Sequence, residues 1–167
     1  MSNKHFLALP VTDSCFSEIR AKNRYYVDKT PYLKTVFSED EAVDDKSLIN
    51  GTTVLLLTRP RRFGKTLLMS MFESFLKISA KEPGNITKHL NYFKGTKILE
   101  DKEFCKKYMG QFPVISITLK DVLGDDFESA YLKLAEVVSA KANEFSFLKE
   151  SPYLNEMEKA KFNLLCD

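Results

Sequence analysis

The sequence predicts an α/β fold built around a parallel sheet. Two short runs, 52–58 and 113–119, are largely apolar and rich in β-branched residues, and an amphipathic helical pattern covers 65–78 between them. Such runs are typical of parallel strands whose two faces are both covered, and alternation of strands with helices is the order in which these sheets are built. The prediction is therefore a sheet whose strands are connected by helices.

The composition is that of a globular domain. The chain has 167 residues, of which 44% are hydrophobic and 29% are charged. This length is typical of one domain that buries a core without disulfides or metals. The 25 Lys and Arg residues nearly balance the 23 Asp and Glu residues, so the net charge of +2 does not favour a strongly basic binder of nucleic acid or anionic membranes. No apolar run reaches the roughly 18 residues of a membrane span, and no membrane partner is expected.

The cysteines indicate a reducing compartment. Cys15, Cys105 and Cys166 form an odd set without CxxC spacing, which favours a cytoplasmic location. Only His5 and His89 accompany them, so the sequence disfavours a zinc site.

Capping signals and periodicity predict the remaining elements. Thr30-Pro31 is expected to start a helix, because Thr can cap a helix and Pro is tolerated at its first position. Ser151-Pro152 repeats this signal near the end of the chain. Further helices are expected over 13–22, 86–93, 101–108 and 126–147.

The segment that carries chemistry connects the first β-rich run to the helix after it. It reads Arg59-Pro60-Arg61-Arg62-Phe63-Gly64-Lys65-Thr66. Against the Walker A pattern G-x-x-x-x-G-K-[ST], it matches the last three positions and has Arg59 in place of the first Gly. Because a buried strand is expected to enter the loop and an amphipathic helix to leave it, the context is that of a phosphate loop. The fold class thereby narrows to a three-layer α/β fold of the P-loop NTPase type.

Each residue type suits phosphate chemistry. Successive N–H groups at a helix N-terminus form a concave array of donors for phosphate oxygens, and Gly64 allows close approach or a positive φ. Lys65, the candidate catalytic residue, would reach the β- and γ-phosphates, and the Thr66 hydroxyl would ligate Mg²⁺. Arg61 and Arg62 add positive charge nearby. The alternative is a basic connecting loop that binds nothing.

Two motifs together resemble the bacterial AAA-ATPase-like family. They are Tyr25-Tyr26-Val27-Asp28-Lys29-Thr30 and, about thirty residues later, the loop with Leu67 added. Weaker matches at 91–95 and 112–117 extend the resemblance over most of the chain. In this family the loop itself carries Arg at the position of Arg59.

The resemblance implies an ATP-binding protein of the additional-strand class of P-loop ATPases that uses Mg²⁺ and has no defined cellular role. Members usually continue into a nuclease-like domain of the PD-(D/E)XK type. By analogy, Tyr26, Val27 and Asp28 would lie near the adenine, although a core strand followed by a cap is an equal alternative for them. The implied nucleotide-binding loop comprises Arg59, Pro60, Arg61, Arg62, Phe63, Gly64, Lys65, Thr66 and Leu67.

The resemblance also implies that this chain is the N-terminal portion of a P-loop ATPase domain, with an N-terminal helical, adenine-side segment over 1–50 and a P-loop core over 51–167. An apolar strand ending in acidic residues, the Walker B motif, is not recognisable, and Asp121 after the second β-rich run reads better as a loop or cap residue. Hydrolysis would therefore depend on residues beyond Asp167. Missing C-terminal domains or self-association would complete the sheet, and nucleic-acid contact is expected only in the longer protein.

Two other functions compete. A non-enzymatic interaction or DNA-binding module would use the Arg-rich loop on phosphodiesters, and a small-molecule kinase would use the same loop on ATP. The near-neutral total charge disfavours DNA binding, and the Tyr25–Thr30 motif has no obvious place in a small kinase.

Overall fold

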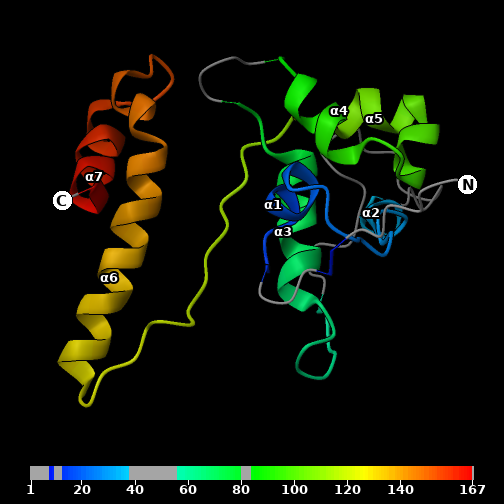
Figure 1. The fold of residues 1–167 in the computed structure, drawn as a ribbon. Coiled ribbons are helices and arrows are strands. Elements are labelled where there is room, and N and C mark those ends of the chain that lie inside the picture. The colour runs from blue at the N-terminus through cyan, green and yellow to red at the C-terminus, as the bar shows by residue number, and fades with distance from the viewer. Residues whose placement is uncertain (1–7, 10–12, 38–55, 80–83, 167) are drawn as a thin grey trace, which may run out of the picture. The chain divides into compact units, whose positions relative to one another are not determined.

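The computed structural model of this protein describes residues 8–9, 13–37, 56–79 and 84–166. The elements among them are α1 (Phe16–Ala21), α2 (Tyr32–Val36), α3 (Lys65–Leu76), α4 (Thr87–Phe93), η1 (Lys97–Glu100), α5 (Lys102–Tyr108), α6 (Phe127–Glu144), η2 (Ser146–Glu150) and α7 (Glu156–Cys166). The chain divides into two compact units, Met1–Val114 (unit 1) and Ile115–Asp167 (unit 2), and each is described by itself (Figure 1).

The predicted parallel sheet, and with it the three-layer P-loop NTPase fold, is wrong, because the described residues form helices and no strand. The run 113–119 forms no strand, and in the run 52–58 only residues 56–58 are described, which form no strand either. The exposed apolar side chains of the later run are Ile115, Ile117 and Leu119. A β-rich run becomes a strand only where a second backbone takes up its N–H and C=O groups, and neither run meets one in the described ranges.

Most predicted helices are confirmed, with shorter bounds. The pattern over 65–78 corresponds to α3, and those over 13–22, 86–93, 101–108 and 126–147 correspond to α1, α4, α5 and α6. Asp101 and Asp126 cap α5 and α6, because their carboxylates accept hydrogen bonds from the N–H groups of Phe104 (3.0 Å) and Ser129 (2.7 Å).

Both helix starts predicted from a Pro are shifted. At α2 the N-cap position is Pro31, with no side-chain cap. The helix predicted to start at Ser151-Pro152 is α7, which begins only at Glu156 because Asn155 and Glu158 form a capping box. The Asn155 Oδ1 accepts from the Glu158 N–H at 2.9 Å, and the Glu158 carboxylate accepts from the Asn155 N–H at 2.9 Å.

The core of unit 1 is aromatic and is organised around α3. Phe75 on α3, Phe93 on α4 and Phe16 on α1 are all fully buried. The ring centroids of Phe75 and Phe93 lie 5.3 Å apart, and those of Phe16 and Phe93 lie 4.8 Å apart. Burial of such side chains contributes about 1.5–3 kcal/mol each, so these contacts fix α1 and α4 against α3.

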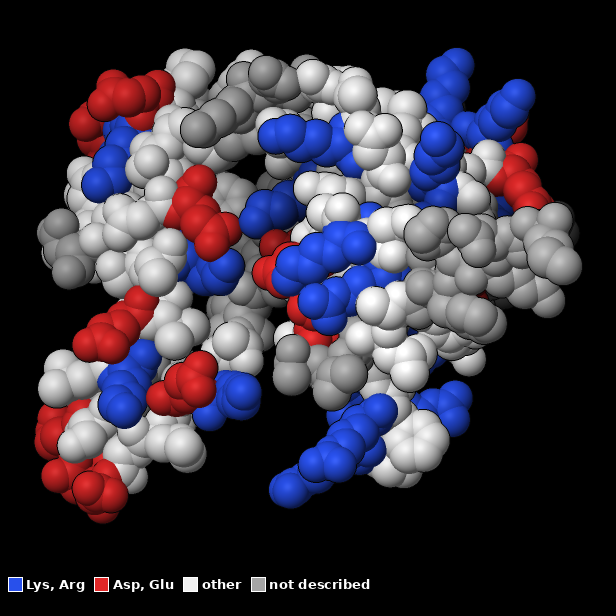
Figure 2. All heavy atoms as spheres, in the orientation of Figure 1, with Lys and Arg blue, Asp and Glu red and all other residues white. Residues whose placement is uncertain are grey.

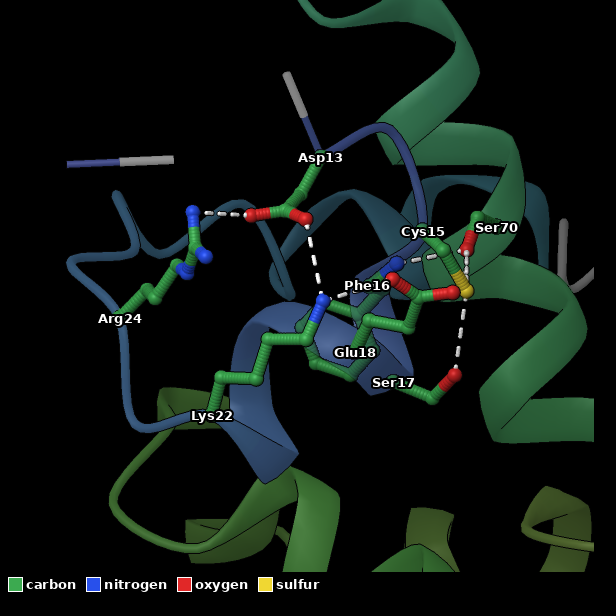
Figure 3. Close-up of polar contacts among 8 residues, drawn as sticks. All are labelled: Asp13, Cys15, Phe16, Ser17, Glu18, Lys22, Arg24 and Ser70. Atoms are coloured by element: carbon green, nitrogen blue, oxygen red, sulfur yellow. Dashed lines mark hydrogen bonds and ion pairs between the residues drawn. The ribbon is translucent and has the colours of Figure 1, made fainter. Parts of the chain in front are cut away.

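A polar contact sets where α1 meets α3 (Figure 3). Ser70 on α3 accepts a hydrogen bond from the Phe16 N–H at 2.7 Å, and its hydroxyl also lies 3.7 Å from the Cys15 Sγ. Burial raises the pKa of the Cys15 thiol, but hydrogen bonds from Ser17, from the Glu18 backbone and from Ser70 outweigh burial and lower that pKa overall. This helix junction therefore also favours the thiolate form of Cys15.

Unit 2 is a helical hairpin, in which α6 and α7 lie side by side (Figure 1). The Cys166 carbonyl at the end of α7 accepts from the Ser139 hydroxyl (3.1 Å) and from the Asn143 amide (2.9 Å) of α6. Neither helix has a buried residue. A groove of about 580 Å³ is lined by apolar side chains from both helices, including Tyr131, Leu132 and Leu164.

The two units differ in charge. Lys and Arg outnumber Asp and Glu by 19 to 13 before residue 115 and are outnumbered by 6 to 10 from there on. Figure 2 shows the corresponding excess of basic side chains over unit 1. Within the described ranges, no helix combines the length and the apolar character that a membrane crossing needs.

Candidate functional site

The candidate site is the loop that leads into α3. Gly64 is the N-cap residue of this helix and has φ +76° and ψ +28°, the left-handed conformation that glycine adopts without steric cost. Arg62 also has a positive φ, +68°. A residue with a Cβ in this region costs about 1–2 kcal/mol, so the loop holds its curvature at an energetic cost.

The N-terminus of α3 is open. Its first hydrogen bond within the helix runs from the Leu68 N–H to the Gly64 carbonyl at 2.9 Å, and no side chain caps the helix. The N–H groups of Lys65, Thr66 and Leu67 therefore have no acceptor within the helix. Together with the helix dipole, these donors favour an anion at this end of α3.

The side chain of Lys65 folds back onto the loop. Its ammonium group donates to the Arg59 carbonyl and, at 3.1 Å, to the Pro60 carbonyl. Thr66 is exposed on the first turn of α3, and Leu67 packs partly buried against the core. The ammonium of Lys65 thus stays beside the open helix end and is bound there by neutral acceptors.

A pocket of about 220 Å³ opens between this loop and the Tyr25–Thr30 motif. Its lining comprises Lys29, Tyr32, Leu57, Arg59, Phe63, Gly64, Lys65 and Leu68. Three of these residues are cationic and none is acidic. The pocket therefore suits a small anionic ligand with an apolar portion.

The structure brings only part of the predicted site to this pocket. Of the predicted residues, Arg59, Phe63, Gly64 and Lys65 line it. The described lining does not include Pro60, Arg61, Arg62, Thr66, Leu67, Tyr26, Val27 or Asp28. Arg61 and Arg62 are exposed. In Figure 2, basic side chains stand out at the tip of unit 1 that carries the loop.

Asp28 joins three backbone and side-chain groups of the fold. Its Oδ1 accepts from the Thr30 N–H (2.9 Å) and the Thr30 hydroxyl (2.7 Å), and its Oδ2 accepts from the Lys97 N–H (2.8 Å). Partial burial raises the pKa of the Asp28 carboxyl, but the hydrogen bonds from Lys97 and Thr30 outweigh burial and hold this pKa below its usual value. Both oxygens are engaged, so the carboxylate ties the motif to η1.

The other two predicted adenine-side residues behave differently from each other. Val27 is 60% exposed. Tyr26 is partly buried; its hydroxyl accepts from the Lys29 N–H at 3.2 Å and lies 3.4 Å from the Met71 sulfur of α3. Tyr26 therefore supports the segment that presents Lys29.

Sequence reasoning missed Lys29, Tyr32, Leu57 and Leu68 as lining residues. Lys29 has the clearest signal, since it lies within the motif that carries the family resemblance. Its ammonium group donates to the Phe63 carbonyl at 3.3 Å, which joins the two motifs directly. The apolar positions have no comparable signal, because side chains of this type are common throughout the core.

The described residues hold no group of three or more His, Cys, Asp or Glu side chains that could ligate a metal. The sequence predicts one metal ligand, the Thr66 hydroxyl, and Thr66 lies on the first turn of α3. Asp121, the acid after the second β-rich run, belongs to unit 2.

A family model described as "Predicted AAA-ATPase" (AAA-ATPase-like) matches residues 10–166. The chain belongs to this family. The match covers nearly the whole chain and includes both motifs of the AAA-ATPase-like resemblance. No curated protein and no solved structure matches this AAA-ATPase-like chain significantly. Membership supports nucleotide use in general terms.

Proposed function

We propose that this AAA-ATPase-like chain binds ATP through the loop Arg59–Thr66 and the N-terminus of α3. The observation that carries the proposal is the open N-terminus of α3, placed beside a pocket whose described lining has three cationic side chains and no acidic one. Phosphate oxygens would take up the N–H groups that no side chain caps. The proposal requires this loop and helix and does not depend on a sheet.

Each loop residue has a distinct part in this proposal. Gly64 leaves room for a phosphate at the backbone, because it has no Cβ and adopts a positive φ without steric cost. Lys65 would exchange the carbonyls of Arg59 and Pro60 for phosphate oxygens, an exchange favoured by opposite charge. The apolar lining residues Leu57 and Leu68 would contact the nucleoside.

The residues of this site would bind Mg²⁺ only when a nucleotide supplies further ligands. Mg²⁺ keeps several waters and is commonly held by few protein groups plus substrate phosphates. The Thr66 hydroxyl on the first turn of α3 would be the protein ligand, and Mg²⁺ would neutralise phosphate charge. Affinity for ATP should therefore depend on Mg²⁺ more strongly in the wild type than in Thr66→Val.

Calorimetric titration of the full chain with ATP tests the proposal. Lys65→Ala should weaken ATP binding about 10- to 100-fold, the value of one or two hydrogen bonds to a charged group. The matched control is Lys88→Ala, which removes an exposed lysine from α4 and should leave affinity unchanged. Equal affinity of the wild type and Lys65→Ala, or no binding by the wild type, would refute the proposal.

A further inference from the structure

We propose that Lys29 is a second phosphate-binding lysine of the site, supplied from outside the loop by the Tyr25–Thr30 motif. The inference rests on the proposed function and adds to it a named residue and a preference for a polyphosphate. It starts from the position of the Lys29 ammonium group, which lies at the mouth of the loop and 3.3 Å from the Phe63 carbonyl.

The position of this ammonium group is close to the phosphate-binding backbone. The Phe63 carbonyl directly precedes Gly64, and a Cβ built on Gly64 would lie 3.1 Å from the Lys29 Nζ. The cation therefore approaches the one residue of the loop that has no side chain to keep it away. Gly64 is also the N-cap of α3, so Lys29 lies beside the open helix end.

The backbone around Lys29 holds it in place. The Lys29 N–H donates to the Tyr26 hydroxyl at 3.2 Å, and the next residue, Thr30, is fully buried and hydrogen-bonded to Asp28. Tyr26 itself contacts the sulfur of Met71 on α3 at 3.4 Å. The lysine thus extends from an anchored segment, which reduces the entropy lost when its ammonium binds a ligand.

The acceptor that Lys29 holds is neutral. A backbone carbonyl binds an ammonium more weakly than a phosphate oxygen does, because hydrogen bonds between opposite charges are shorter and stronger. The Lys65 ammonium group likewise donates to neutral acceptors, the Arg59 and Pro60 carbonyls. Two lysines on carbonyls of one loop, with Arg59 also in the lining, form a site that a ligand of several negative charges can satisfy.

A site with these cations should discriminate by phosphate number. The three lining cations, Lys29, Arg59 and Lys65, exceed the charge that a single phosphate neutralises. Adenosine offers nothing to Lys29, whereas a triphosphate offers oxygens to both lysines. The contribution of Lys29 to binding affinity should therefore be absent for adenosine, larger for ADP and largest for ATP.

The test is titration of the full chain with ATP, ADP and adenosine by calorimetry, with thermal unfolding as a second readout. Lys29→Met should weaken ATP binding about 10-fold or more, weaken ADP binding less and leave adenosine binding unchanged. Lys29→Arg should retain most of the ATP affinity, and the control Lys88→Met should match the wild type. The rise in melting temperature caused by saturating ATP should shrink in Lys29→Met.

The alternatives give different results. ATP affinity of Lys29→Met within two-fold of the wild type, while Lys65→Ala loses binding, would overturn the inference and leave the proposed function standing. An equal loss for ATP, ADP and adenosine would show that Lys29 only braces the loop, and it too would overturn the inference. No ATP binding by the wild type would overturn both.

Discussion

Replacing Asp28 by Ala should destabilise unit 1 by about 2–4 kcal/mol. The substitution removes three hydrogen bonds, two with Thr30 and one with the Lys97 N–H. A hydrogen bond to a charged group is worth about 1.5–3 kcal/mol, less where water can replace it, and Asp28 is half-buried. Thr30 is fully buried, so its hydroxyl would lose its acceptor without gaining water. The sum is a large fraction of the roughly 5–15 kcal/mol that stabilises a domain.

Urea unfolding followed by circular dichroism measures this loss. Asp28→Asn keeps one acceptor oxygen and should fall between the wild type and Asp28→Ala. Asp125→Ala removes an exposed carboxylate of unit 2 and serves as the control, expected within about 0.5 kcal/mol of the wild type. A free energy of unfolding for Asp28→Ala that equals that of the control would refute the structural role of this carboxylate.

The Asp28 carboxylate should also make the free energy of unfolding depend on pH. Its pKa is lower in the folded protein, so its contribution is fully present above the unfolded pKa of about 3.9 and is lost as the pH falls through the folded pKa. The stability difference between the wild type and Asp28→Asn should therefore shrink below about pH 4. A difference of the same size at pH 3 and pH 7 would contradict the lowered pKa.

Two further substitutions and one labelling reaction test the fold. Gly64→Ala should cost about 1–2 kcal/mol in urea unfolding, because φ is +76° and the new Cβ would crowd the Lys29 Nζ at 3.1 Å; an unchanged midpoint would contradict this. Phe75→Ala should cost about 3–5 kcal/mol, and a loss below 1 kcal/mol would show that its ring is not in the core. Iodoacetamide at pH 7.5 should modify Cys15 before Cys105 by mass spectrometry, since burial raises the pKa of the Cys105 thiol; the reverse order would contradict the assigned pKa directions.

Local features of this chain were predictable from the sequence. The spacing of Leu68, Met71 and Phe75 predicts the buried face of α3, and these three side chains are buried. Gly64 was expected to allow a positive φ, and it adopts one. Such features depend on residues within one or two turns, which a single sequence records directly.

Features that need distant partners were not predictable in the same way. The run 113–119 has the composition of a strand, but pairing depends on a second backbone that the run itself does not encode. Lys29 reaches the Phe63 carbonyl of the loop before α3 only because the chain folds its segment against α3, and no local pattern specifies that contact. The start of α7 was misplaced because the capping box of Asn155 and Glu158 outweighs the Ser151-Pro152 signal.

The absence of buried side chains in α6 and α7 has a consequence for how long each part of the chain keeps its shape. Separating α6 from α7 exposes only side chains that are already partly exposed, so α6 should open at a lower free-energy cost than α3. The buried face of α3, in contrast, can open only when the aromatic core of unit 1 opens with it, an event limited by global unfolding. The loop 59–64 leads into the more protected helix, and its curvature should therefore persist through local openings of α6.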